Sequence, residues 1–178
     1  MPYIIAGIII LIIVIIFISI SNNLARAVVK IDEAESGIDV ALTKRYDVLT
    51  KQLDITKAYA KHEKETLEAV INLRKGMTMA EKSAAVTEMN RVQERINIVA
   101  ENYPELRSSE NFRTLQIAVT DVEEHLQAAR RAYNANVSAY NQMLVVFPSS
   151  MVANMKHLTR SEFFEAEEAK RADVKMEF

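Results

Sequence analysis

The chain has 178 residues and a formal net charge of −2, with a pI of about 6.0. It has no cysteine, which excludes disulfides, a thiol nucleophile and zinc–thiolate chemistry, and its charge balance disfavours a general nucleic-acid binder. Three glycines and three prolines are too few for a Gly-rich phosphate-binding loop or for many β-turns, so the composition favours a mostly helical protein.

The N-terminus carries a long, uncharged, apolar segment. All 22 Lys and Arg residues and all 24 Asp and Glu residues come after position 25, and residues 3–20 are apolar except for Ser19. A helix over residues 3–20 is about 27 Å long, and extending it to residue 22 matches a bilayer core of roughly 30 Å. We therefore predict a transmembrane anchor over residues 1–22. The side chains expected to face lipid are Tyr3, Ile4, Ile8, Leu11, Ile15, Phe17 and Ile20.

A cleaved signal peptide is the alternative for this segment, because Ser19-Ile20-Ser21 imitates a small-x-small cleavage site. No Lys or Arg precedes the apolar run, and the run is longer than the apolar region of a signal peptide, so a retained anchor is favoured. Arg26 and Lys30 follow the run, whereas only the α-amino group precedes it. The excess of positive charge predicts a short N-terminus outside and the following domain in the cytoplasm.

The rest of the chain is predicted to be a helical domain with a single core, extending over residues 23–158. Gly76 and Pro104 are the only glycine and proline between residues 38 and 147, so they divide this stretch into three long helices. Gly76 suits the left-handed residue that ends a helix. Thr78 and Glu81, three residues apart, have the pattern of a capping box that starts the next helix.

The third long helix is predicted to begin at an N-cap formed by Ser108 or Ser109 and to end at Phe147, before Pro148. A second capping-box pattern, Thr159–Glu162, predicts one more short helix in the acidic segment 159–178.

Apolar residues alternate at spacings of three and four along the third helix, which predicts a continuous packing seam. Its positions are Phe112, Leu115, Val119, Val122, Leu126, Ala129, Tyr133, Val137, Tyr140, Leu144 and Phe147. A shorter seam on the second helix contains Val86, Met89, Val92, Ile96, Val99 and Tyr103. The predicted fold is therefore all-α: a transmembrane helix, then an antiparallel bundle of three long helices, then a short C-terminal helix or tail. Alternating helix directions would place Pro148 at the end of the bundle farthest from the membrane, unless the first helix bends near Gly37.

Several short stretches occur in a characteristic order and spacing between about residue 22 and residue 168. They are Gly37–Val40, Lys44–Asp47, Tyr59–Glu68, Tyr103–Leu106, Glu110–Phe112, Ala128–Asn134, Tyr140-Asn141 and Phe147-Pro148. Together they resemble the LemA family of bacterial membrane-anchored helical proteins. Thr50 stands where that family often has proline, and Ala58 where it often has glycine, so the first helix is expected to continue without a break here.

The resemblance implies a single N-terminal transmembrane helix in the bacterial cytoplasmic membrane, a small external N-terminus and a helical cytoplasmic domain. Relatives in this family are associated with building internal membrane compartments. Family genes often neighbour those of membrane proteases or TPM-domain proteins, which makes such proteins candidate partners.

No motif in the sequence predicts a catalytic, cofactor-binding or metal-binding site. His62-Glu63 begins like a zincin motif, but Thr66 occupies the position of the second histidine. None of the three histidines follows a glutamate at the Glu-x-x-His spacing of di-iron bundles. We therefore expect a protein that is not an enzyme and needs no cofactor.

Two charged clusters are candidates for an interaction patch: Lys61, His62 and Glu63 on the first long helix, and Arg130 and Arg131 on the third. The alternative for both clusters is a solvated helix surface. Met151 and Met155 belong to a short amphipathic element that either touches lipid or a neighbouring subunit, or closes the end of the bundle.

The leading hypothesis from the sequence is a membrane-anchored helical protein that self-associates into a scaffold on membrane lipid. The alternative is an adaptor or regulator of a membrane enzyme such as a protease.

Overall fold

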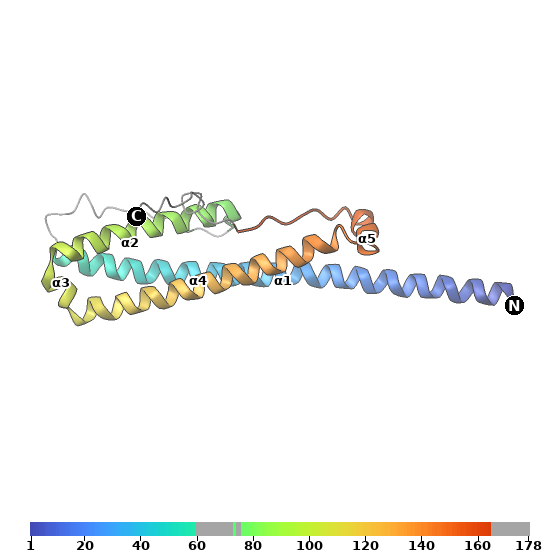
Figure 1. The fold of residues 1–178 in the computed structure, drawn as a ribbon, viewed down its shortest axis with the longest axis horizontal. Helices are drawn as coiled ribbons and strands as arrows, with labels where there is room; N and C mark the ends of the chain where they lie inside the picture. Colours follow the sequence, from blue (N-terminus) through green and yellow to red (C-terminus); the bar gives the residue numbers. More distant parts are fainter. Residues whose placement is uncertain (60–72, 74–75, 165–178) are drawn as a thin grey trace, which may run out of the picture. The chain divides into compact units, whose positions relative to one another are not determined.

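The computed structural model describes residues 1–59, 73 and 76–164, and these residues form five helices and no strand (Figure 1). The helices are α1 (Pro2–Tyr59), α2 (Met79–Asn102), α3 (Pro104–Ser108), α4 (Glu110–Met143) and α5 (Ser149–Met155). The all-α class and the apolar N-terminal helix predicted from the sequence are confirmed. As expected from Thr50 and Ala58, α1 has no break before Tyr59.

The start of α2 follows the predicted capping chemistry. The Glu81 backbone N–H donates to Thr78 Oγ1 at 3.2 Å, and the Thr78 backbone N–H donates to Glu81 Oε2 at 2.8 Å. These two bonds satisfy N–H groups that the first turn of a helix leaves without partners. Gly76 has a φ of +75°, the left-handed conformation expected for it.

The junction between α2 and α4 contains a short helix that the sequence analysis did not predict. Pro104 occupies the first position of α3, where its missing N–H has no consequence. Ser109 then caps α4, because its Oγ accepts from the backbone N–H of Phe112 at 3.3 Å. The serine cap is therefore confirmed, and Ser109 provides it.

The third predicted helix ends earlier than expected, at Met143 rather than at Phe147. The N–H groups of Val145 and Val146 both donate to the carbonyl of Gln142, at 3.1 Å, so the backbone turns here. Phe147 cannot easily be helical, because it precedes Pro148.

Packing divides into two compact units rather than the single core expected. The anchor unit comprises Met1–Ser36 and Arg131–Phe163; the bundle unit comprises Gly37–Arg130 and Phe164–Phe178, described as far as Phe164. Helices α1 and α4 each contribute to both units. The predicted domain limits at residues 22 and 158 stay predictions.

Within the bundle unit, α1 and α2 run in the same direction, which differs from the alternating directions expected. Asp39 pairs with Lys82 near the start of α2, and Arg45 contacts Asn90 about two turns farther along both helices. Parallel neighbours require a long connection, because the chain must return along the length of α2, about 36 Å for its 24 residues. The connection between Tyr59 and Met79 is long enough for this, since an extended chain spans about 3.3 Å per residue.

The bundle unit buries an apolar cluster where α2, α3 and α4 meet. Its members are Val92, Ile96, Ala100, Leu106 and Phe112, with Leu53, Ile55 and Tyr103 packed against them. The predicted α2 seam is confirmed, since its first five positions are buried and Tyr103 is half-buried. Removing these side chains from water is the main driving force for packing the unit.

The anchor unit packs the C-terminal half of α4, together with α5, against α1. Its buried apolar residues are Leu24, Ala27, Ile31, Tyr133, Val137, Tyr140, Val152 and Ala153. Asn136 Nδ2 donates to the Lys30 carbonyl at 3.0 Å, and Lys156 Nζ donates to Ser21 Oγ. The end of α4 and α5 therefore lie beside the end of the apolar segment, and not at the membrane-distal position that alternating directions predicted for Pro148.

Candidate functional site: membrane anchor and buried polar contacts

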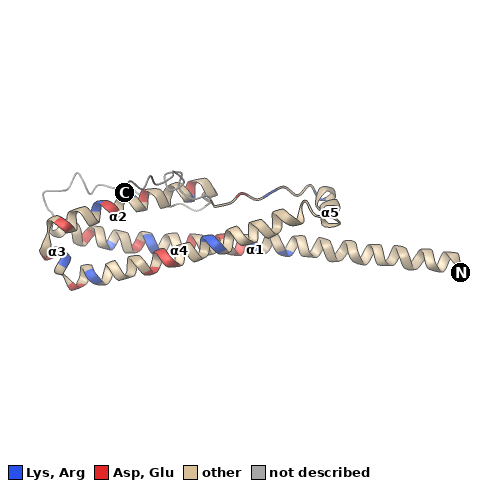
Figure 2. Cartoon of the chain, viewed as in Figure 1, with Lys and Arg blue, Asp and Glu red and all other residues tan. Residues whose placement is uncertain are grey.

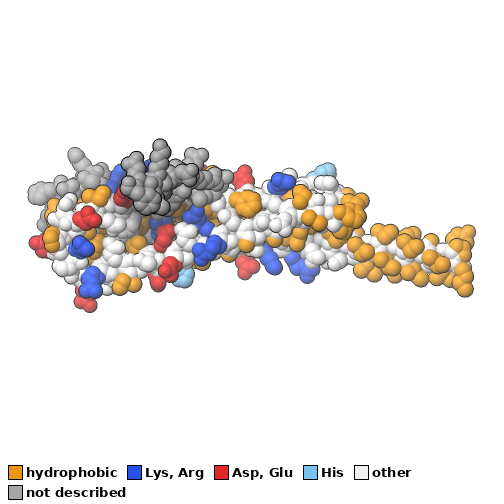
Figure 3. Space-filling model, in the orientation of Figure 1, with side chains coloured by type: hydrophobic (Ala, Val, Ile, Leu, Met, Phe, Trp, Pro, Cys, Tyr) orange, Lys and Arg blue, Asp and Glu red, His pale blue; other side chains and the backbone are white. Residues whose placement is uncertain are grey.

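The first 18 residues of α1 have the surface that a bilayer requires. Within Pro2–Tyr59, the most apolar window contains no buried residue. Six of the seven predicted lipid-facing side chains, from Tyr3 to Phe17, are exposed, and Ile20 is half-buried. Figure 2 shows no Lys, Arg, Asp or Glu position along this segment, and Figure 3 shows hydrophobic side chains over its visible side. A helix with apolar residues on every side supports anchoring in a membrane.

The burial pattern also shows where packing against the rest of the anchor unit begins. No residue before Ile20 is buried, Ser21 is half-buried and Leu24 is fully buried. Arg26 is exposed and donates from Nη2 to Asn23 Oδ1 at 2.7 Å. The segment expected in lipid therefore ends where protein packing and positive charge begin.

The bundle unit holds a buried arginine between three helices. The Arg45 side chain on α1 is 4% exposed; its Nη2 lies 2.9 Å from Glu123 Oε2 on α4 and 2.5 Å from Asn90 Oδ1 on α2. The Gln127 amide donates to the other Glu123 oxygen, Oε1, at 3.0 Å. An arginine removed from water is costly unless it is paired in this way, so these contacts favour one alignment of the three helices.

A second charged contact links the beginnings of the same two bundle helices, α1 and α2. Lys82 Nζ lies 2.6 Å from Asp39 Oδ1, and the lysine side chain is almost fully buried while the aspartate is exposed. Thr56 donates to the Gln52 carbonyl at 2.8 Å. The Gln52 side-chain amide is buried, and neither its nitrogen nor its oxygen has a hydrogen-bond partner among the described residues. Sequence analysis missed this polar interior, because nothing in the spacing of Arg45, Gln52 and Lys82 marks them as inward-facing.

The predicted interaction patch is only partly visible. Lys61, His62 and Glu63 lie outside the described residues. Arg130 is half-buried, and its guanidinium lies over the Phe164 ring at 4.6 Å from the centroid, a cation–π contact. Arg131 is exposed on α4. Arg130 thus has a structural role in packing Phe164, whereas a binding role for the patch stays a prediction.

Tyrosines and an asparagine of α4 hold residues 159–162 along the anchor unit. Tyr133 Oη donates to the Glu162 carbonyl at 3.0 Å, and Tyr140 Oη donates to the Thr159 carbonyl at 3.1 Å. Asn141 makes two bonds with the Ser161 backbone, each at 3.0 Å. The short helix predicted from Thr159–Glu162 is therefore wrong as far as Phe164: this stretch is not helical, because α4 side chains bind its backbone groups instead.

The two tyrosines differ from solvent-exposed ones in their ionisation. Burial, followed by the nearby carboxylates of Glu35, Glu162 and Asp32, raises the pKa of Tyr133 above its ordinary value of 10.0. Burial alone raises the pKa of Tyr140. Both phenols therefore stay neutral donors throughout the physiological pH range.

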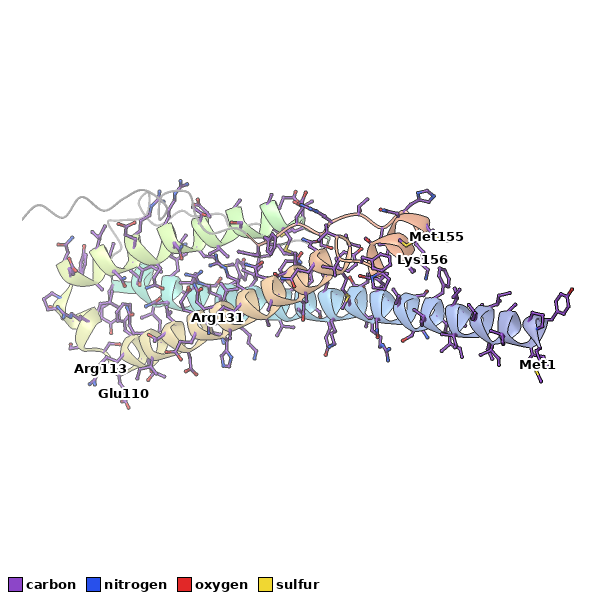
Figure 4. The ribbon with its side chains drawn as sticks, turned by 45° about the vertical axis from the view of Figure 1, so that its right-hand side comes forward. Met1, Glu110, Arg113, Arg131, Met155 and Lys156 are labelled. Atoms are coloured by element: carbon purple, nitrogen blue, oxygen red, sulfur yellow. The ribbon has the colours of Figure 1, made fainter. Side chains whose placement is uncertain are left out.

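A surface depression of about 540 Å³ lies where α2, α3 and α4 meet in the bundle unit. Its lining residues are Asn97, Ala100, Glu101, Arg107, Phe112, Arg113, Gln116 and Ile117. Asn97 Oδ1 accepts from Gln116 Nε2 at 3.2 Å across the depression, while Arg113 points outward near the start of α4 (Figure 4). Its open, mixed polar and apolar lining suits contact with another protein surface better than a small substrate.

Among residues 1–59, 73 and 76–164, no three His, Asp or Glu side chains come together in a way that could hold a metal ion. His125 and His157 are both exposed. His62 and Glu63 lie outside that part of the chain, so the prediction that the protein has no catalytic, cofactor or metal site stays a prediction.

Comparison with known proteins identifies the family. The LemA family profile matches residues 34–178, which is most of the chain. The chain belongs to the LemA family. It is 26% identical over 164 residues to Protein LemA of Metamycoplasma hominis, an alignment that covers 89% of this chain and 75% of the relative.

Shorter stretches of this LemA-family chain are similar to magnetosome proteins. Magnetosome protein MamQ 2 of Paramagnetospirillum magneticum is 27% identical over 75 residues, covering 42% of this chain and 28% of that protein. Magnetosome protein MamQ of Magnetospirillum gryphiswaldense is 24% identical over 70 residues, covering 39% and 26%. The resemblance noted in the sequence is confirmed, and membership implies a membrane-associated protein from a family not known for enzymatic activity.

Proposed function

We propose that this LemA-family chain is a non-enzymatic, membrane-anchored helical protein that self-associates into a membrane-linked scaffold. The observation that carries the proposal is an exposed apolar site on the bundle unit. Ile117 is 70% exposed beside the depression between α2, α3 and α4. Ile98 on α2 is also more than half exposed.

These two isoleucines are fixed in position by neighbouring contacts. Asn97 and Gln116, which precede them in α2 and α4, are joined by the 3.2 Å hydrogen bond across the depression. Arg113 adds an exposed cation, a residue type that is enriched in protein interfaces, while Phe112 lines the depression as a buried member of the apolar cluster. The long α4 seam does not support self-association, because the chain itself buries or half-buries its positions from Phe112 to Leu144.

The similarity to proteins named as magnetosome proteins adds modest support to this proposal. It covers less than half of this chain, so the support is for a shared helical segment.

Two differently tagged full-length copies, co-expressed and solubilised in mild detergent, test the self-association. We expect one tag to recover the other copy, and Ile117→Glu to reduce this recovery, since a charge would be desolvated at the interface. Ala128→Glu, on an exposed position of the same helix, adds the same charge and should leave recovery unchanged. Lysates mixed only after solubilisation control for exchange in detergent. Failure to recover the second copy of the unaltered chain from co-expressing cells would contradict the scaffold.

For orientation, we propose that the chain lies in the bacterial cytoplasmic membrane with its N-terminus outside and its helical units in the cytoplasm. Arg26 and Lys30 after the apolar segment support this. The native chain has no cysteine, so a single Asp121→Cys on the exposed surface of α4 gives a clean labelling site. We expect an impermeant maleimide to label it in lysed cells only; labelling in intact cells would reverse the orientation.

The second candidate is an adaptor that binds a membrane enzyme such as a protease, and the charged rim of the depression favours it. Arg107, Arg113 and Glu101 suit a polar partner. A photo-crosslinking amino acid at Arg113 distinguishes the two functions. Adducts with copies of the same chain support the scaffold, whereas adducts with a different membrane protein support the adaptor.

A further inference from the structure

A second apolar surface follows α4 in the anchor unit. Val145 and Val146 are each more than half exposed, Phe147 is 75% exposed, and Met151 and Met155 on α5 are 59% and 68% exposed. Isolated apolar residues at a surface are ordinary. Five large ones within eleven residues form a patch, and such patches usually contact an apolar neighbour. We refer to these five residues as the α4–α5 patch.

The short helix α5 has one buried side and one exposed side, and the exposed side belongs to the α4–α5 patch. Val152 and Ala153 are buried in the anchor unit, whereas Met151 and Met155, four residues apart and therefore on one side of the helix, are exposed. Burial of the inner side holds α5 against the unit. The outer side is presented to the surroundings by a helix that is already packed in place.

The location of the patch follows from its contacts with α1. Lys156, the residue after Met155, donates from Nζ to Ser21 Oγ, immediately after the apolar segment ends at Ile20. Asn136, earlier in α4, contacts Lys30 farther along α1, so α4 returns toward the apolar segment as it approaches α5. Figure 4 shows Met155 and Lys156 beside α1, and Figure 3 shows hydrophobic side chains gathering there next to the apolar helix.

From this arrangement we infer that the α4–α5 patch is a second membrane contact, inserted into the interface of the leaflet from which α1 emerges. The occupant is lipid because Lys156 holds the patch beside Ser21, directly after the exposed apolar segment of α1, which itself ends at that interface. Lys156 directly follows Met155 of the patch, and Arg26 is the first charged residue of α1 after the apolar segment. Apolar side chains flanked by basic ones are typical of segments that lie in the headgroup region.

A second membrane contact would limit how the anchor unit moves relative to the bilayer. One transmembrane helix alone leaves the attached protein free to rotate about the helix axis and to tilt. A patch held beside α1 by Lys156 and Asn136 restricts both motions of the anchor unit, because rotation or tilt would lift apolar side chains out of the interface.

Depth-dependent fluorescence quenching tests the inference on the full-length chain. Met151→Cys, introduced into the cysteine-free chain and labelled with the environment-sensitive dye NBD, is reconstituted into phosphatidylcholine–phosphatidylglycerol vesicles. Spin labels are placed on the lipid headgroup or at a shallow or deep acyl position. We expect a blue-shifted emission and the greatest loss of fluorescence with the shallow acyl label.

The matched control is Ala132→Cys, an exposed position on α4 in the same unit but farther from the apolar segment than Asn136. Its NBD probe should emit as in water and keep its fluorescence with every spin-labelled lipid. Far-ultraviolet circular dichroism of both labelled chains verifies that the helices are retained.

A Met151 probe that emits as in water and is not quenched by any lipid would overturn the inference. An unquenched probe, together with disulfides between copies when the unlabelled Met151→Cys chain is oxidised in the same vesicles, would overturn it in favour of a contact between chains. The result does not depend on self-association, since a monomeric anchored chain gives the same quenching if the patch is in lipid.

Discussion

The Arg45 guanidinium and the Glu123 carboxylate lie 2.9 Å apart in the interior of the bundle unit, where they join α1 to α4. Asn90 of α2 contacts the same guanidinium at 2.5 Å. A polar contact shared by three helices specifies their register more strictly than apolar seams do, because a shift of one residue would leave charges buried without partners.

A double-mutant cycle on this pair should show substantial coupling. Arg45→Met and Glu123→Gln, singly and together, are predicted to give an interaction free energy of about 1–2 kcal/mol, below the range for fully buried pairs because Glu123 is 35% exposed. Chemical denaturation monitored by circular dichroism measures it. The matched control is Arg91–Glu88, an exposed pair within α2 at 3.1 Å, for which about 0.5 kcal/mol or less is expected. Equal coupling in the two pairs would contradict the role assigned to Arg45.

Replacing Gln52 with methionine should raise stability. The Gln52 amide is buried without a hydrogen-bond partner among the described residues, and methionine has a similar size but no such polar group. We expect Gln52→Met to increase the free energy of unfolding by about 1 kcal/mol. Gln127→Met is the control: it removes the 3.0 Å bond to Glu123 and should lower stability. A loss of stability in Gln52→Met would show that the amide is satisfied in solution.

Replacing Gly37 or Gly76 with alanine should change the stability of the protein in opposite directions. Gly37 lies inside α1, and a methyl group added there would meet no neighbouring atom within 4 Å, so Gly37→Ala is predicted to stabilise the helix by about 0.5–1 kcal/mol. Gly76 also has space for a methyl group, but its φ of +75° disfavours alanine, and Gly76→Ala is predicted to cost about 1 kcal/mol. Thermal unfolding of the two variants beside the parent chain tests both signs at once.

Alkaline pH should weaken the attachment of residues 159–162 through Tyr133. Because the folded state raises the pKa of this phenol, the neutral form is favoured on folding. Its contribution to stability is complete below the ordinary pKa of 10 and is lost as pH rises from there through the folded pKa, while the unfolded chain ionises first. Tyr133→Phe should therefore show a smaller loss of stability above pH 10 than the parent chain does. Parallel pH profiles for the two proteins would refute this effect of Tyr133.

Local chemistry made several features of the fold predictable from sequence. The capping box at Thr78 and Glu81, the left-handed Gly76 and the serine cap of α4 each depend on neighbouring residues only. The apolar run at residues 3–20 was equally informative, because its length and lack of charge have few interpretations.

Features that depend on distant contacts could not be predicted in the same way. The parallel direction of α1 and α2 is defined by contacts between residues more than 40 positions apart, which helix-forming patterns do not encode. Thr159–Glu162 has the pattern of a helix start, but Tyr133, Tyr140 and Asn141 bind its backbone instead. The inward positions of Arg45 and Lys82 were missed because charged residues usually face solvent.

The measurement that tests the central claim most directly is the mass of the full-length protein, purified in mild detergent and then returned to lipid bilayers, combined with imaging of the bilayers. The scaffold account predicts assemblies of several copies in both environments, smaller for Ile117→Glu and unchanged for Ala128→Glu. A dispersed single chain under every lipid condition would contradict it.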